Sequence, residues 1–94
     1  MTEVFRKPLY FVWRWEQGFP YVVHFYVMKA YRSVKVARIC ARRLKKYFAQ
    51  KGFRRIMINA RSSDIKIQKA IEYYFKTKPY GEADEHKFYV VEVV

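Results

Sequence analysis

Four segments of the chain alternate apolar and polar residues with the two-residue period of a β-strand. They span residues 9–15, 21–28, 53–61 and 87–94. Gly18 and Pro20 lie between the first two and favour a hairpin connection. Strict alternation puts one set of side chains on one face of the second strand: Tyr21, Val23, Phe25 and Val27. The opposite face then carries Val22, His24, Tyr26 and Met28.

Residues 33–51 have the three-and-four spacing of an amphipathic helix. Ser33 is a suitable N-cap, and Gly52 follows the last turn, where a left-handed residue is favoured. The helix therefore buries a stripe on one side, made of Ala37, Cys40, Ala41, Leu44, Tyr47 and Phe48.

A second helix begins after Ser62-Ser63-Asp64, because hydroxyl and carboxylate oxygens accept hydrogen bonds from the first amides of a helix. It extends to about Lys76 and buries apolar residues such as Ile67 and Ile71. Residues 77–86, with Pro79 and Gly81, form a loop before the final strand.

The order strand, strand, helix, strand, helix, strand predicts an α/β fold, an α+β two-layer arrangement with a mixed four-stranded sheet. Right-handed crossovers in one direction put both helices on one face of the sheet. With 94 residues, the chain is expected to form a single domain, residues 1–94.

The face of the sheet without helices is expected to carry polar and aromatic side chains: Tyr10, Arg14, His24, Tyr26, Arg55, Asn59 and Tyr89. Apolar neighbours share it in this interpretation: Val12, Met28, Met57, Val91 and Val93. Such a face can stack unpaired bases or pair with a second copy of the chain. We favour the homodimer, because large apolar patches rarely stay exposed on a monomer.

Positive charge is concentrated in residues 29–61. This stretch holds twelve of the twenty Lys and Arg residues and no Asp or Glu. It therefore accounts for the whole formal net charge of +12. No carboxylate at helical spacing neutralises Lys35, Arg38 or Arg42, and like charges at that spacing destabilise a helix by about 0.2–0.5 kcal/mol per pair. A solvated surface also explains a charged helix face, but the pattern favours a polyanionic partner.

This pattern predicts a non-catalytic nucleic-acid-binding protein, DNA or RNA, with low sequence specificity. The phosphate contacts are assigned to eight residues: Lys35, Arg38, Arg42, Arg43, Lys45, Lys46, Arg54 and Arg55. One alternative is an adaptor or inhibitor that docks its basic face on an acidic protein. A second alternative is a small metal-dependent nuclease.

The nuclease alternative depends on the acidic loop before the last strand, with Glu82, Asp84, Glu85 and His86. A solvated turn explains that loop as well, so we assign no catalytic residue, no metal and no cofactor. Cys40, the single cysteine, is expected to be a small buried hydrophobe and fits an intracellular, cytoplasmic protein. The abundance of Tyr, Ile, Val, Lys and Arg is typical of thermophilic proteins. No apolar run is long enough to span a bilayer.

Overall fold

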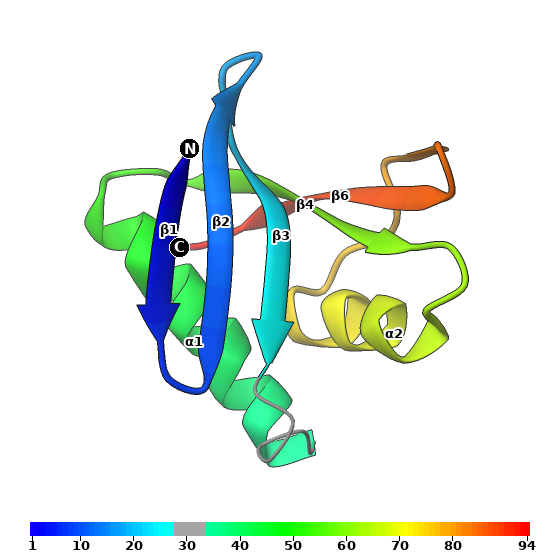
Figure 1. Ribbon diagram of the computed structural model, residues 1–94, viewed down its shortest axis with the longest axis horizontal. Coiled ribbons are helices and arrows are strands. Elements are labelled where there is room, and N and C mark those ends of the chain that lie inside the picture. The colour runs from blue at the N-terminus through cyan, green and yellow to red at the C-terminus, as the bar shows by residue number, and fades with distance from the viewer. Residues whose placement is uncertain (28–33) are drawn as a thin grey trace.

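In the computed structural model, which describes residues 1–27 and 34–94, one six-stranded mixed sheet has the strand order β1-β2-β3-β4-β6-β5 (Figure 1). The elements in chain order are β1 (Thr2–Arg6), β2 (Leu9–Glu16), β3 (Phe19–Val27), α1 (Val34–Gln50), β4 (Arg55–Arg61), α2 (Ile65–Tyr74), β5 (Gly81–Ala83) and β6 (His86–Glu92). The α/β arrangement with two helices and a mixed sheet is confirmed, but the predicted count of four strands is wrong.

The two strands absent from the prediction lie at the edges of the sheet. β1 pairs antiparallel with β2, and in β1 only Val4 is buried. β5 pairs with β6 and has no buried residue. Neither strand has the repeated apolar alternation that identifies a strand in a sequence, because each has little or no contact with the core.

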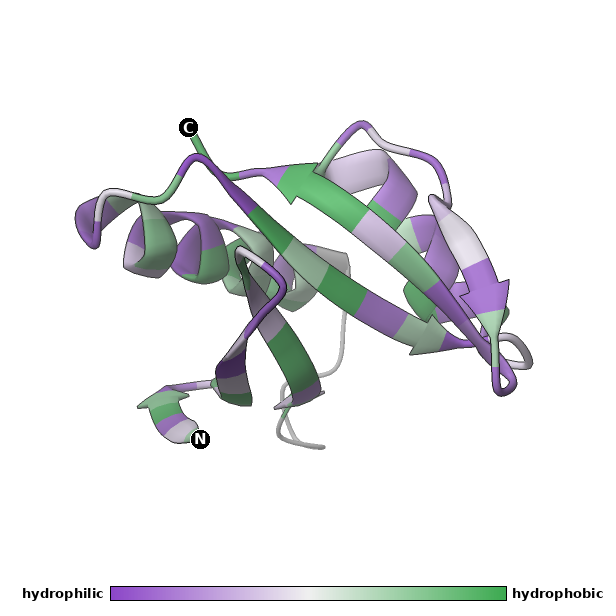
Figure 2. Cartoon of the chain, turned by 90° about the horizontal axis from the view of Figure 1, so that it is seen from above, coloured by the Kyte–Doolittle hydropathy of each residue, from purple (hydrophilic) through white to green (hydrophobic). Residues whose placement is uncertain are grey.

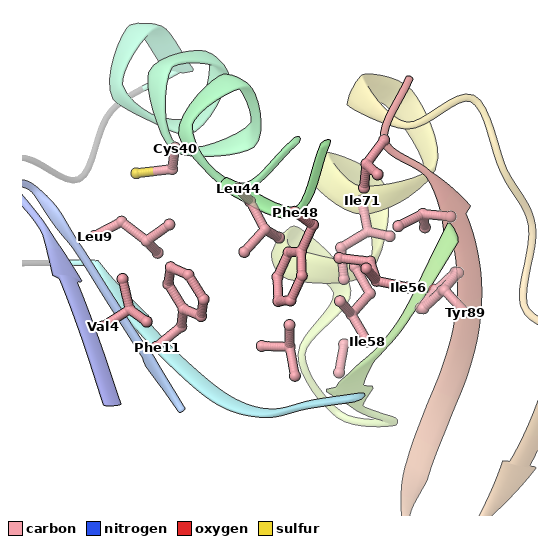
Figure 3. Packing of buried hydrophobic residues seen from close by; sticks show 14 residues of the cluster. Val4, Leu9, Phe11, Cys40, Leu44, Phe48, Ile56, Ile58, Ile71 and Tyr89 are labelled. Carbon is pink, nitrogen blue, oxygen red and sulfur yellow. The ribbon is translucent and has the colours of Figure 1, made fainter. Parts of the chain in front are cut away.

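Both helices cover the same face of the sheet. Val22, Ile58 and Tyr89 lie side by side on that face, in register across β3, β4 and β6. The buried cluster on it joins residues of α1 and α2 to residues of the strands (Figure 3). Along β4 and β6 the buried residues of this face alternate with half-buried or exposed residues of the other, and the hydrophobic segments of both strands lie beside the helices (Figure 2). Ile56, Ile58 and Ala60 are buried on the helix-covered face, opposite the face predicted for Arg55, Met57 and Asn59.

The amphipathic pattern of α1 is confirmed. Cys40, Ala41, Leu44 and Phe48 are buried, and burial raises the pKa of the Cys40 thiol. Gly52 ends the helix with a φ of 89°. The Phe53 amide donates to the Phe48 carbonyl at 3.1 Å, the bond expected of a glycine-terminated helix. The predicted N-cap, Ser33, lies outside the described residues.

At the start of α2, Asp64 is the N-cap, and its Oδ1 accepts a hydrogen bond from the Ile67 amide at 3.1 Å. The predicted start of the helix is therefore confirmed. The side chain of Gln68 is buried and donates to the carbonyls of Arg61 and Ser62, which fixes the turn between β4 and α2. Among the described helices, none combines the length and apolar character needed to cross a membrane.

Candidate functional site

β3 and β4 are the only parallel pair in the described sheet, and they stay paired over a short distance. Their register consists of Tyr21 with Met57 and Val22 with Ile58. β3 nevertheless continues to Val27 and β4 to Arg61. The carboxyl ends of the two strands point in different directions (Figure 1). We call residues 23–27 of β3 and 59–61 of β4 the fork.

The fork lies where ligand sites of open α/β sheets are usually found. In open α/β sheets, ligands bind in the crevice outside the carboxyl ends of the strands. Here α1 follows β3 and α2 follows β4. The backbone edges of the two strands at the fork have no ladder partner on each other among the described residues.

A β-bulge lies on the β3 side of the fork. Val12 pairs with His24 and Trp13 pairs with Val22, so Val23 is an extra residue with no partner on β2. Because of this extra residue, the side chains after the bulge alternate in the opposite phase. Val22 therefore shares the helix-covered face with Phe25 and Val27. The predicted assignment of Val22 to the opposite face is wrong, because a bulge breaks strict alternation.

The uncovered face of the sheet differs in part from the prediction. His24 and Tyr26 are exposed on β3, and Arg55 is exposed on β4. Tyr10 and Asn59 are half-buried, as are Val12 and Met57. Three residues assigned to this face are instead buried beneath the helices: Tyr89, Val91 and Val93. Met28 lies outside the described residues.

Tyr89 is a clear correction on that face. It is completely buried, and its hydroxyl donates to Glu72 of α2 at 2.9 Å. Burial, together with the Glu72 carboxylate, raises the pKa of the Tyr89 phenol well above its ordinary value. On β6, Phe88 and Val90 take the place of Tyr89 and Val91 on the uncovered face, and both are half-buried. Association of two copies through this face stays a prediction.

The structure does not bring the eight predicted phosphate-binding residues to one place. Five of them are exposed along α1: Lys35, Arg38, Arg42, Arg43 and Lys46. Lys45 is half-buried and turned towards α2. Its Nζ donates to the Tyr74 carbonyl at 3.0 Å and lies 5.1 Å from the centre of the Phe75 ring. Its predicted place on the outer face of the helix is therefore wrong.

The remaining two, Arg54 and Arg55, lie at the opposite ends of the strands from the fork. They line a surface cavity of about 570 Å³ beside the β2–β3 hairpin and Gly52. Arg55 also pairs with Glu92 at 3.6 Å. These two arginines are therefore separated from Lys35 by most of the length of α1.

The acidic loop is organised as a turn. Ser62 donates a hydrogen bond to Glu82, and Nδ1 of His86 donates to the Asp84 carbonyl at 2.8 Å. Asp84 and Glu85 have positive φ angles of 50° and 62°. Within residues 1–27 and 34–94, no three His, Cys, Asp or Glu side chains are grouped as a metal site requires.

Comparison with known proteins gives a family match and a match to a solved structure. A profile described as the Acetyltransferase (GNAT) family matches residues 8–76, which include both strands of the fork and both helices that follow them. No curated protein matches the chain. A solved structure described as an acetyltransferase of the GNAT family from Listeria monocytogenes is similar in fold, with a TM-score of 0.67 at 13% sequence identity. The similarity covers 90% of this chain and 57% of that protein, so this chain spans little more than half its length.

The match to an enzyme family contradicts the prediction of a non-catalytic nucleic-acid-binding protein and its DNA-binding assignment. The matched family is one of acetyltransferases, so the match also contradicts the adaptor and the nuclease alternatives. Sequence reasoning missed the fork because it considered the charge of α1 and not the strand that precedes it. The signal available in the sequence was the order of β3, α1, β4 and α2, which places the carboxyl ends of two strands beside the starts of two helices.

Proposed function

The chain belongs to the Acetyltransferase (GNAT) family, and we propose that it transfers an acetyl group from acetyl-coenzyme A to a nucleophilic acceptor at the β3–β4 fork. The observation that carries the proposal is the early end of the β3–β4 ladder within the matched residues. Acetyl-coenzyme A supplies an activated acetyl thioester when bound.

The backbone of the fork suits the arm of such a donor. Coenzyme A carries its thiol at the end of an extended chain with two amide groups. An extended amide chain can bind a strand edge through main-chain hydrogen bonds, as an added strand does. Residues 24–27 of β3 pair with β2, and the β3–β4 ladder ends at Val22 and Ile58, so the arm is proposed to lie along β3 beyond that point.

The start of α1 suits the phosphate groups of the donor. The amino end of a helix carries a partial positive charge, which attracts phosphates. α1 begins at Val34, after the fork end of β3. Lys35 and Arg38 are exposed in its first two turns and add positive charge there. Part of the basic face of α1 therefore has a use in an acetyltransferase.

The acceptor is proposed to approach from the face of the sheet that the helices leave uncovered. His24 and Tyr26 are exposed there, on the β3 segment that borders the fork. An imidazole can take a proton from an acceptor, and a phenol can give one to a leaving thiolate. The reaction joins the acceptor to the acetyl carbon, breaks the carbon–sulfur bond and releases coenzyme A as a free thiol.

A thiol-release assay tests the proposal. The purified chain is mixed with acetyl-coenzyme A and a panel of amine and alcohol acceptors, and free coenzyme A is titrated with a thiol reagent. Acetylated product is identified by mass spectrometry. We expect release that depends on both the chain and one class of acceptor. Failure to bind coenzyme A in calorimetry, together with no release for any acceptor, would contradict the proposal.

A further inference from the structure

Asn59 stands at the inner end of the fork. It follows Ile58, the last β4 residue in register with β3, and it lies on the uncovered face of the sheet. It is the only asparagine in the chain, and it is half-buried. Its place is where the next rung of the parallel ladder would form if the two strands stayed together.

The amide of Asn59 joins β4 to β3 through its side chain. Its Nδ2 donates to the Tyr21 hydroxyl at 2.6 Å and to the Val23 carbonyl at 3.2 Å. An asparagine amide has two hydrogens, so one side chain can supply both bonds. Val23 is the bulge residue of β3. The Asn59 side chain of β4 thus donates a hydrogen bond to the carbonyl of the bulge residue of β3, at the point where the backbone pairing of the two strands ends.

Neighbouring side chains hold this arrangement in place. The Tyr21 ring lies 6.4 Å from the Phe88 ring and 5.7 Å from the Arg14 guanidinium. Arg14 is itself paired with Glu16 at 2.8 Å. The Tyr21 ring, whose hydroxyl accepts the hydrogen bond from Asn59, is therefore contacted on two sides. Groups supported in this way keep a defined geometry.

We propose that Asn59 is a positioning residue for acetyl transfer. Its two hydrogen bonds fix the bulge of β3 and the inner end of the fork, and so fix where the arm of the donor is held. The proposal rests on the proposed function, because the fork matters to catalysis only if the donor binds there. It goes beyond that function by naming the side chain that sets the shape of the site. Small displacements of a bound reactant reduce rates strongly, so such a residue affects activity without touching the reacting atoms.

Two substitutions remove the hydrogen bond to the Val23 carbonyl with little change in size. Asn59→Asp replaces the donating group with a carboxylate oxygen, which repels the Val23 carbonyl at neutral pH. Asn59→Leu removes all polar contact. Thr77→Val is the matched control, since the Thr77 hydroxyl donates to the Val90 carbonyl at 3.3 Å beyond the end of α2. Each substitution removes a side-chain hydrogen bond to a backbone carbonyl.

The first readout is amide hydrogen exchange of the free protein, which needs no ligand. In both Asn59 variants we expect the amides of residues 24–27 to exchange at least about tenfold faster, because the segment loses its tie to β4. The amides of β6 should be unchanged, and Thr77→Val should leave residues 24–27 unchanged. Unaltered exchange of residues 24–27 in both Asn59 variants would overturn the proposal.

The second readout separates positioning from stability. For Asn59→Asp we expect the KM for acetyl-coenzyme A to rise about tenfold, with a melting temperature close to that of Thr77→Val. Faster exchange with an unchanged KM overturns the positioning role. If the wild-type chain binds no coenzyme A, the proposed function fails and the positioning role with it, and the exchange result then decides whether Asn59 holds the strands at all.

Discussion

β4 has two neighbours in the sheet, and the structure joins it to them very differently. With β6 it forms an antiparallel register along its full length, from Arg55 opposite Glu92 to Arg61 opposite His86. With β3 it forms a parallel register of two residue pairs. The first pairing lies over the core, whereas the second ends after two residue pairs, at the place where we propose that the acetyl donor binds. A strand can thus stabilise the fold on one side and contribute to a site on the other.

The same substitution on each side of β4 tests this difference in stability. Val91→Ala, in β6, should lower the free energy of unfolding by about 2 kcal/mol, since Val91 is 1% exposed and two methyl groups lose their packing. Roughly 4–8 °C of melting temperature is lost per kcal/mol in a domain of this size. Val27→Ala, at the end of β3, should cost about half as much or less, because Val27 is half-buried. Thermal denaturation measures both. Equal losses in the free energy of unfolding would show that the fork is packed as tightly as the β4–β6 pairing.

On the β6 side of β4, removing the hydrogen bond between Tyr89 and Glu72 should have a smaller effect on stability. Tyr89→Phe should lower the free energy of unfolding by about 1.5 kcal/mol, because a bond to a carboxylate is lost. The pKa of the Tyr89 phenol is raised in the folded state, so the folded state holds the proton more tightly than the unfolded state. That stabilisation is complete below about pH 10 and is lost as the pH rises further.

Denaturant titrations at pH 8 and above pH 10 therefore separate the two proteins. The wild type should lose more stability than Tyr89→Phe over this interval, because only the wild type has that phenol to ionise. A parallel loss in both proteins would show that Tyr89 does not titrate with unfolding.

Charge reversal along α1 distinguishes the fork end of the helix from its far end. Lys35→Glu should weaken binding of coenzyme A about fivefold, since a carboxylate in the first turn repels phosphate and opposes the helix dipole's attraction for it. The helix itself should not be destabilised, because a negative charge is favourable at its amino end. Lys46→Glu is the control, as Lys46 is also exposed but lies in the last turns. Calorimetry at low salt measures both. A similar loss in the two variants would place the phosphates elsewhere.

Sequence reasoning recovers those parts of the fold that have a clear apolar pattern. The helix around Leu44 and Phe48 and the strand with Ile56 and Ile58 were predicted correctly, because each puts a regular stripe into the core. The edge strands were missed, since residues 2–6 and 81–83 bury a single side chain between them. The bulge at Val23 was also missed, because nothing in a run of apolar residues marks one of them as extra.

The candidate site was harder to predict than the fold. Asn59 and Val23 are 36 residues apart in the chain, and their side-chain to backbone contact forms at the point where β3 and β4 diverge. No local pattern encodes that divergence. The basic residues of α1 were conspicuous in the sequence, but their side chains serve different ends. Lys45 binds the end of α2, and Lys35 stands near the start of the helix. The charge of α1 indicated only a polyanionic partner. The fold is needed to indicate which part of the helix lies where such a partner would bind.

Hydrogen exchange with and without coenzyme A tests the central claim most directly. The account predicts that the ligand slows exchange of amides in residues 24–27 of β3, residues 59–61 of β4 and the first turn of α1, with no change at the β2–β3 hairpin around Gly18. Protection confined to the hairpin and the cavity beside Arg54, or no protection at saturating coenzyme A, would contradict it.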